Sequence, residues 1–210
     1  MRIKDKFSTD FSGFFFGKIR KYKLLVLSFF STKLNYFLLF LKKVTIGKNC
    51  TFYGLPIVTR AYNSKILIGD RCSFRSDKSS NLIGLNRKCI ISTFGEGTVL
   101  KIGNNSGFSG TVIGAANSIT IGNNVLSGAN VLITDFDWHP INPEKRHTRE
   151  GVQSAPVVIG NNVWLGINSV VLKGVTIGDN TVIGANSLVV KDIPANVIAA
   201  GNPCKVLKPL

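Results

Sequence analysis

Aliphatic residues recur at every sixth position in the C-terminal third of this chain. From Ile159 the sequence divides without a gap into six hexads, and each begins with an aliphatic residue: Ile159, Leu165, Val171, Ile177, Ile183 and Val189. The fifth positions are mostly small or β-branched: Val163, Ser169, Val175, Thr181, Ser187 and Ile193. A helix or an alternating strand has a shorter period. With Gly, Asn and Asp in between, the pattern predicts short strands joined by tight turns, with three hexads in each triangular coil.

Residues 44–205 are predicted to form one all-β solenoid of stacked coils, followed by a short tail, 206–210. Ile-Gly pairs mark four earlier coils, at Ile46, Ile68, Ile102 and Ile121, with spacings of 22, 34 and 19 residues and a further 38 to Ile159. Because three hexads make 18 residues, insertions must lie at the corners of the early coils. The last interval equals two coils plus two residues, or one coil plus an excursion of 20. The polar composition of 134–155 favours the excursion.

The first 43 residues differ in composition from the rest. They hold ten Lys or Arg against two Asp, and nine of the fourteen Phe, in a chain whose formal net charge is +15. Hydrophobic residues make up 44% of the chain and charged residues 18%, which argues against disorder. We predict a basic, aromatic, helical arm over 1–43, whose charge would attract phosphates, a membrane surface or nucleic acid.

Three arrangements of this arm are compatible with its sequence. The apolar run 24–41 has 18 residues and contains Lys33, which disfavours a spanning helix. A helix in the interface of an anionic membrane is favoured, and packing against the assembled subunits of the protein is the remaining arrangement. No A-x-A cleavage site follows Phe30, so we expect a cytoplasmic protein, at the inner face of the membrane if the arm binds there. No nucleic-acid-binding motif is present, so nucleic acid is not an expected partner.

The cysteines predict neither a metal centre nor a disulfide framework. Cys50, Cys72, Cys89 and Cys204 contain no C-x-x-C pair. Cys50 and Cys72 fall at the fifth, inward position of their hexads. We expect small buried thiols in a reducing compartment, and no bound metal.

Residues 134–156 interrupt the repeat and carry most of the candidate chemistry. They read TDFDWHPINPEKRHTREGVQSAP and contain both histidines of the chain, His139 and His147. Asp135, Asp137 and Trp138 lie beside His139. Loops on a rigid scaffold often carry function. His147 lies in the charged run EKRHTRE, typical of a solvated loop, so His139 is the stronger candidate.

Residues 121–207 resemble a known family. The segments IGNNVLSGANVLITDFDWHP, VVIGNNVWLG and GVTIGDNTVIGANSLVVKDIPANVIAAGNPCKV are similar to the hexapeptide-repeat O-acetyltransferases, especially galactoside, maltose and capsule or O-antigen acetyltransferases. The resemblance implies a left-handed parallel β-helix, although crossovers between parallel strands are usually right-handed. It also implies a homotrimer, with acetyl-CoA in a groove between neighbouring subunits.

The resemblance places the catalytic role on His139. An imidazole, whose usual pKa is about 6.5, can remove the proton of a sugar hydroxyl that attacks a thioester. A carboxylate on the other ring nitrogen would fix the tautomer; Asp135 or Asp137 could supply it, and Asp137 is favoured. Neither Cys nor Ser lies in a nucleophile setting, so direct transfer is expected.

The donor to the oxyanion is left open by the sequence. The galactoside type uses an Asn one coil before the histidine, and ungapped alignment puts Phe108 there. Ser109 and Asn130 lie nearby, but neither is a clean match. This departure weakens the case for a galactoside as the acceptor.

The resemblance places acetyl-CoA along the late coils. Three small residues there would let the pantetheine approach the backbone closely: Gly166, Ala185 and Ser187. Lys191 and Lys205 match basic positions that lie near the CoA phosphates in the family. Trp164 follows a fifth position and is expected to face outward at the groove or the subunit interface.

The expected function is acetyl-CoA-dependent O-acetylation of a sugar, in a cell-surface polysaccharide or its lipid-linked or nucleotide-linked precursor. One alternative is an N-acetyltransferase of a nucleotide-linked amino sugar. Such enzymes normally carry a nucleotide-binding domain in front of the helix, and residues 1–43 are too short to form one. A metal-dependent hydratase of the γ-carbonic anhydrase type would need three His ligands, and the chain has two His. A non-catalytic scaffold is the last alternative.

Overall fold

The computed structural model describes residues 10–148 and 150–210 as one helix followed by a stack of short strands. The helix α2 spans Phe11–Leu41 and the two 3₁₀ turns are η1 (Lys78–Ser80) and η2 (Pro143–Lys145). Sheet A contains β1 (Thr45–Ile46), β4 (Lys65–Ile68), β7 (Val99–Ile102), β10 (Ser118–Ile121), β13 (Val157–Ile159) and β16 (Thr176–Ile177). Sheet B contains β2 (Thr51–Tyr53), β5 (Ser73–Arg75), β8 (Gly107–Ser109), β11 (Leu126–Ala129), β14 (Trp164–Leu165), β17 (Val182–Ile183), β19 (Val197–Ala200) and β20 (Lys205–Pro209). Sheet C contains β3 (Ile57–Thr59), β6 (Ile90–Thr93), β9 (Val112–Ala115), β12 (Leu132–Thr134), β15 (Val170–Val171) and β18 (Leu188–Val189).

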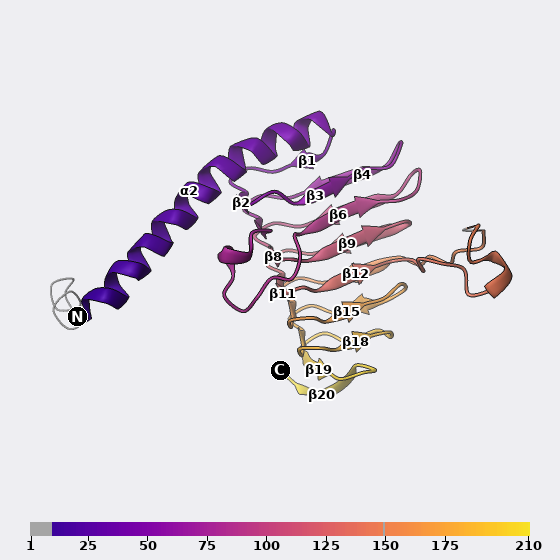
Figure 1. The fold of residues 1–210 in the computed structure, drawn as a ribbon. Helices are drawn as coiled ribbons and strands as arrows, with labels where there is room; N and C mark the ends of the chain where they lie inside the picture. Colours follow the sequence, from indigo (N-terminus) through magenta and orange to yellow (C-terminus); the bar gives the residue numbers. More distant parts are fainter. Residues whose placement is uncertain (1–9, 149) are drawn as a thin grey trace.

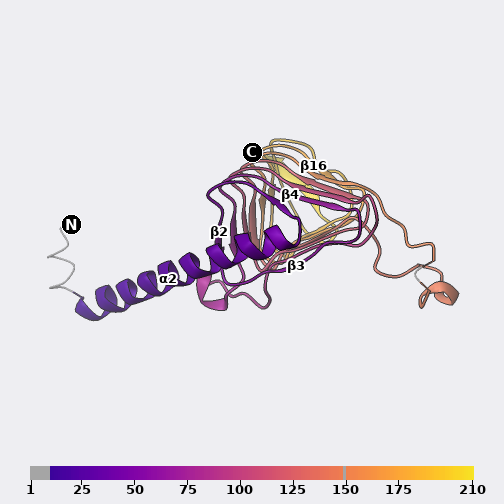
Figure 2. The same cartoon turned by 90° about the horizontal axis from the view of Figure 1, so that it is seen from above.

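Each turn of the chain adds one strand to each sheet, which is the architecture of a left-handed β-helix (Figures 1 and 2). The strands pair in parallel, apart from β20, which is antiparallel to β19. Equivalent isoleucines align from coil to coil: Ile46, Ile68, Ile102, Ile121, Ile159 and Ile177. Ile121 pairs directly with Ile159, so the interval between them is one coil plus an excursion. The predicted repeat and the predicted excursion are both confirmed.

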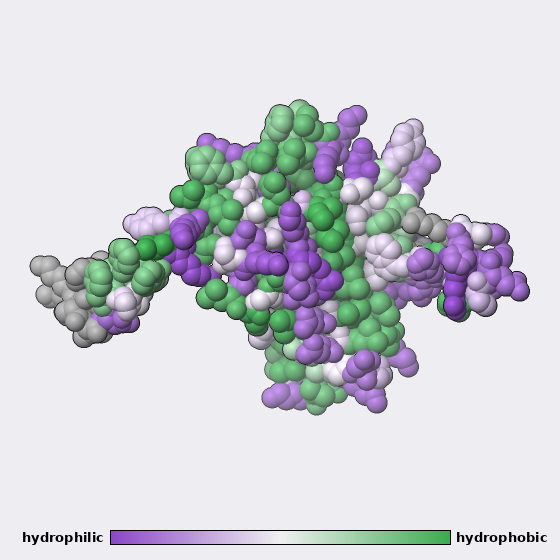
Figure 3. Space-filling view, viewed as in Figure 1, coloured by the Kyte–Doolittle hydropathy of each residue, from purple (hydrophilic) through white to green (hydrophobic). Residues whose placement is uncertain are grey.

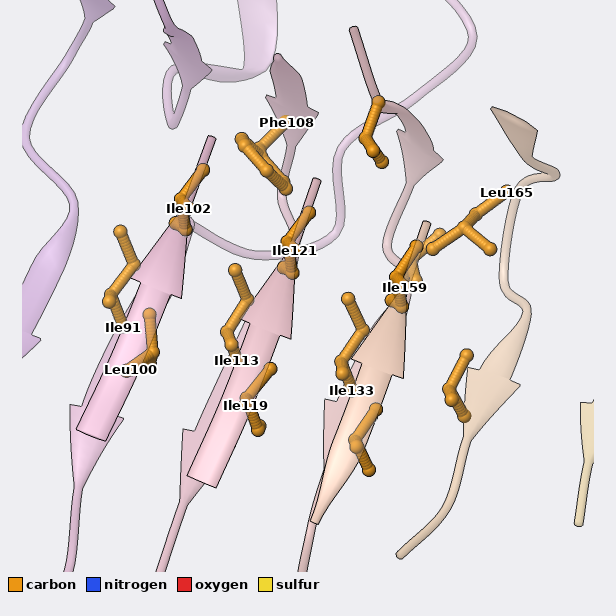
Figure 4. Packing of buried hydrophobic residues seen from close by; sticks show 14 of the residues in the cluster. Ile91, Leu100, Ile102, Phe108, Ile113, Ile119, Ile121, Ile133, Ile159 and Leu165 are labelled. Carbon is orange, nitrogen blue, oxygen red and sulfur yellow. The ribbon is translucent and has the colours of Figure 1, made fainter. Parts of the chain in front are cut away.

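The core is a set of side-chain columns that run along the stack. Figure 4 shows one column of isoleucines and a second on the facing strands. In the early coils a third column is aromatic: the rings of Phe52 and Phe74 stack with centroids 5.0 Å apart, and those of Phe74 and Phe108 at 5.3 Å. All four cysteines are free and buried, as predicted.

Asparagines at the corners allow the tight turns between strands. Asn124, Asn162, Asn180 and Asn196 have φ between 57° and 60°, the left-handed region that Asn tolerates better than most residues. Their side-chain amides form a ladder, with N···O distances of 3.0, 2.8 and 2.8 Å between successive coils. The corner therefore continues the stacking outside the core.

The C-terminal part of α2 covers the open end of the first coil (Figure 1). The Tyr36 hydroxyl donates to the carbonyl oxygen of Gly47 (2.8 Å) and accepts from the backbone N–H of Cys50 (3.0 Å). Three other α2 side chains form hydrogen bonds with the backbone of Phe52 and Gly54: Ser31, Thr32 and Asn35. These contacts satisfy groups that a preceding coil would otherwise pair, which is how a terminal cap stabilises a solenoid.

The predicted domain boundaries need two adjustments. The first nine residues of the arm predicted for 1–43 lie outside the described residues, and the helix occupies 11–41. Residues 206–210 were predicted as a separate tail, but most of them belong to β20, which pairs with β19. Backbone pairing, rather than the end of the hexad pattern, sets the end of the folded stack.

Candidate active site

Residues 135–156 leave the stack between β12 and β13 and project from one corner (Figures 1 and 2). The predicted loop began at Thr134, which is the last residue of β12. The loop contains η2 and an ion pair between Lys145 and Glu150, whose N···O distance is 2.8 Å. His139 and His147 are both exposed on it.

Asp135 fixes the start of the loop. Its side chain is fully buried, and its two oxygens accept the backbone N–H groups of Ala116 (2.7 Å) and Asn117 (2.9 Å). Burial raises the pKa of the Asp135 carboxyl above its ordinary value, while these N–H groups oppose that shift. The Asp135 carboxylate is therefore committed to the turn between β9 and β10 and does not contact His139.

The ring of His139 is held by a backbone carbonyl. Its Nδ1 lies 3.2 Å from the carbonyl oxygen of Arg146, which can only accept a hydrogen bond. This contact assigns the proton to Nδ1 and leaves Nε2 with a free lone pair. The exposed ring is thus oriented as a base that can approach a bound hydroxyl.

Asp137 binds Lys173 rather than His139. Its Oδ1 lies 2.5 Å from the Nζ of Lys173, which follows β15. The orienting contact predicted for Asp137 is therefore replaced by the Arg146 carbonyl, because Lys173 draws the carboxylate toward the stack. The other oxygen, Oδ2, is buried and has no hydrogen-bond partner among the described residues.

A groove of about 390 Å³ lies on the outer side of sheet B. Three residues predicted to contact acetyl-CoA line it, and these are Trp164, Gly166 and Ala185. Trp164 is 55% exposed, which confirms that it faces outward. A Cβ on Gly166 would lie 2.5 Å from the backbone nitrogen of Ala185, so close stacking of the coils also requires glycine there.

The other predicted CoA residues have different surroundings. Ser187 is buried inside the stack, where its hydroxyl donates to the Gly184 carbonyl oxygen (2.7 Å) and accepts from the N–H of Gly201 (3.1 Å). Ser187 is not among the residues that line the groove. Lys191 and Lys205 are exposed, after β18 and at the start of β20.

The side chains at the three positions considered for the oxyanion are all buried in the fold. Phe108 is 1% exposed and lies in the aromatic column. The Ser109 hydroxyl accepts from the side-chain amide of Asn81 (3.2 Å). The Asn130 amide bonds the insertion between β5 and β6, donating to Gly84.

The loop and the groove lie on opposite sides of the same chain. Viewed along the stack in Figure 2, sheet B forms one side of the triangle, and residues 135–156 leave from the corner opposite. Figure 1 shows the same separation from the side. His139 therefore faces away from the groove of its own chain.

The repeat matches the family model described as bacterial transferase hexapeptide (six repeats) over residues 156–191. The chain is also 33% identical over 167 residues to the putative lipopolysaccharide biosynthesis O-acetyl transferase WbbJ of Escherichia coli strain K12, a match that covers 72% of this chain and 83% of that protein. This chain belongs to the hexapeptide-repeat acetyltransferases.

Other members of the family match parts of this chain. The galactoside O-acetyltransferase of Escherichia coli strain K12 is 46% identical over 117 residues, covering 55% of this chain and 56% of that enzyme. The chain spans about half the length of the first curated relatives it matches. An acetyltransferase of Vibrio cholerae O1 biovar eltor, solved with acetyl coenzyme A, shares the fold at 21% identity, with a TM-score of 0.51 and coverage of 85% of this chain and 78% of that one.

Sequence reasoning missed residues that this hexapeptide-repeat acetyltransferase brings to the site from distant coils. Lys173, Asn81 and Ile83 are examples: the first pairs with Asp137, and the other two line the groove. The long interval between Ile68 and Ile102 signalled the insertion that carries Asn81, but not its position over sheet B. No group of three or more His, Cys, Asp or Glu side chains that could hold a metal occurs within residues 10–148 and 150–210.

Proposed function

We propose that this protein transfers the acetyl group of acetyl-CoA to a sugar hydroxyl. The observation that carries the proposal is the His139 ring, which is exposed on a loop and held through Nδ1 with Nε2 free. The family and the galactoside O-acetyltransferase relative support the reaction type. The groove on sheet B, which has glycine and alanine in its wall, suits the narrow pantetheine arm of the donor.

In the proposed reaction His139 acts as the general base. Nε2 takes the proton of the acceptor hydroxyl as its oxygen attacks the thioester carbonyl. The tetrahedral intermediate then collapses, the C–S bond breaks, and the leaving CoA sulfur receives the proton from the imidazolium. The Arg146 carbonyl, which accepts the Nδ1 hydrogen bond, stabilises the protonated ring. All four cysteines are buried, which favours direct transfer over an acyl-enzyme.

We infer that the working unit is a homotrimer. The loop with His139 and the groove with Ala185 lie on opposite sides of one chain, so a complete site needs the loop of one subunit and the groove of its neighbour. A closed ring of heterologous contacts provides this arrangement in every subunit. Lys191 and Lys205 are proposed to bind the CoA phosphates at the lower end of the groove.

We also infer a role in cell-surface polysaccharide synthesis, on the cytoplasmic side of a membrane. One relative, which matches over 83% of its own length, is a putative lipopolysaccharide biosynthesis enzyme. Within the described residues, α2 is long and apolar enough to cross a membrane by length and composition, and only 17% of its apolar window is buried. Apolar side chains gather along it, interrupted by basic residues (Figure 3). This surface suits an interfacial position on anionic lipid beside a lipid-linked acceptor.

The test is release of free CoA thiol from acetyl-CoA with a panel of sugar and amino-sugar acceptors. We expect turnover with a sugar hydroxyl, and a fall of about 10²-fold or more in His139→Ala, the range for loss of a general base. His147→Ala, in the same loop, is the matched control and should keep its activity. Turnover restricted to amino groups would replace this proposal with N-acetylation. Absence of acetyl-CoA binding would favour the non-catalytic scaffold instead.

A further inference from the structure

A second cavity lies at the base of the loop, on the same corner as His139. Its volume is about 140 Å³, and its lining residues come from two coils and the loop: Phe94, Ala116, Phe136, Asp137, Trp138 and Val152. His139 does not line the cavity, but it directly follows Trp138 of the cavity wall in the chain.

Three aromatic rings form the apolar wall of the cavity. The Phe136 and Trp138 centroids are 4.8 Å apart, and Phe94 lies 5.0 Å from Trp138 and 5.1 Å from Phe136. Phe136 is 8% exposed and anchors the loop on the stack, whereas Trp138 and Phe94 remain 47% and 41% exposed. Anchoring the loop explains the buried Phe136 but not two large rings left open to solvent.

The Asp137 carboxylate is a charged group in the wall of the cavity. Its Oδ1 is paired with Lys173, and its Oδ2 is enclosed by the fold and accepts no hydrogen bond from the described residues. The side chain as a whole is still 27% exposed. A hydroxyl that enters the cavity can therefore donate to the exposed part of this carboxylate.

We propose that this cavity binds the acceptor sugar ring, with its apolar C–H face against Trp138 and Phe94 and one ring hydroxyl donating to the exposed part of the Asp137 carboxylate. A few convergent polar groups in an aromatic pocket fit a ligand with one apolar face and hydroxyls at its edge. A neighbouring hydroxyl of the same ring then reaches His139. Asp137 thereby selects which hydroxyl is left for acetylation. This inference rests on the proposed function, because it assigns the acceptor of that reaction.

The experiment uses the fluorescence of Trp138. Trp138 and Trp164 are the two tryptophans of the chain, so Trp164→Phe leaves Trp138 as the reporter. The probes are the methyl pyranosides of glucose, galactose, mannose, rhamnose and N-acetylglucosamine, titrated into the full chain. We expect a saturable change in Trp138 emission with at least one of them. In the same background, Phe94→Leu and Asp137→Asn should each raise its Kd by about tenfold or more.

Two controls distinguish sugar binding in this cavity from effects elsewhere on the loop and from effects on acetyl-CoA binding. Glu144→Gln, on the exposed part of the same loop, should leave the sugar Kd unchanged, and calorimetric binding of acetyl-CoA should be unaffected by Phe94→Leu. In turnover assays, Phe94→Leu should raise the acceptor KM far more than the KM for acetyl-CoA. Asp137→Asn can weaken the loop through Lys173, and Phe94→Leu keeps the test independent of that effect.

The proposal is overturned if no pyranoside alters the emission, or if Phe94→Leu leaves the sugar Kd unchanged. It is also overturned if Phe94→Leu dissociates the oligomer at unchanged sugar affinity, since the rings would then form a subunit contact. If wild type releases thiol with a sugar that does not bind here, the pocket alone is wrong. If wild type binds no acetyl-CoA, the proposed function itself fails.

Discussion

Asp135 and Asp137 are separated by one residue, yet their carboxylates have different surroundings. The Asp135 carboxylate accepts two backbone N–H groups of a neighbouring coil, whereas Asp137 pairs one oxygen with Lys173 and leaves the other buried without a partner among the described residues. Both stand in the motif DFDWHP, and either was a reasonable partner for His139 on sequence grounds. The structure gives that partnership to the Arg146 carbonyl.

Replacing Asp135 should destabilise the folded protein. Asp135→Asn keeps the size of the side chain but offers one acceptor oxygen where two N–H groups need acceptors. We expect the free energy of unfolding to fall by about 1–3 kcal/mol, the cost of a buried unpaired N–H. Urea denaturation measures this, with the exposed Glu144→Gln as the control. A difference between the two variants that is within error would contradict the anchoring role.

The sequence could not distinguish these residues because their partners come from other coils. Ala116 and Asn117 lie one coil before Asp135, and Lys173 lies at the same corner one coil after Asp137. The hexad pattern identifies which residues face inward, since that follows from local geometry. It carries no information about contacts between a loop and a corner, which depend on how the loop folds back.

At the scale of elements, α2 is both a cap and a projecting surface. Its last turns bond the backbone of the first coil, whereas its N-terminal half extends away from the stack (Figure 2). The composition of 1–43 predicted a helix but left membrane contact, spanning and packing open. The contacts show the C-terminal part packed on the first coil of its own chain, and packing against a trimer stays a prediction. The side chains that make these contacts lie in an apolar run, where the sequence gives no sign of their partners.

Tyr36 is the residue that tests the cap. Tyr36→Phe removes one hydroxyl and leaves the Gly47 carbonyl oxygen and the Cys50 N–H without it. We expect a loss of about 1–3 kcal/mol in unfolding free energy. Tyr22→Phe, on the exposed part of the same helix, should change the value by less than about 0.5 kcal/mol. Chemical denaturation measures the unfolding free energy of both variants. Equal losses in the two would show that α2 does not cap the stack.

The projecting half of α2 makes a prediction about the whole molecule. Lys18, Arg20, Lys21 and Lys23 are exposed beside apolar side chains. Each basic residue near an anionic surface contributes about 1 kcal/mol, so changing all four to Gln should weaken binding to phosphatidylglycerol vesicles by about 100-fold or more. Co-sedimentation measures this, and phosphatidylcholine vesicles should bind the wild type weakly.

The matched control removes four lysines elsewhere on the stack: Lys65, Lys101, Lys205 and Lys208. These lysines are exposed on sheets A and B, away from α2. Their change to Gln should leave vesicle binding largely intact. Equal losses in the two variants would mean that net charge, and not the helix, governs the association.

The whole-molecule fold was accessible from the sequence because a solenoid repeats its own signal. The spacing of Ile121 and Ile159 located both the stack and the excursion, and the pairing of those residues bears this out. The handedness came only from the family resemblance, since a period of six fits coils of either hand. The opposition of loop and groove could not be predicted, because it depends on which corner each insertion leaves.

The central claim is that each active site joins the loop of one subunit to the groove of its neighbour. It is tested by co-expressing His139→Ala and Ala185→Trp, each with its own affinity tag, and isolating oligomers that carry both tags. The first variant lacks the base, and the second blocks the groove that Ala185 lines. Each variant alone should be inactive. In a mixed trimer one of the three interfaces pairs an intact loop with an intact groove, so about a third of wild-type thiol release should return. If the doubly tagged oligomers stay inactive, or if none form, the site does not lie between subunits and the account is wrong.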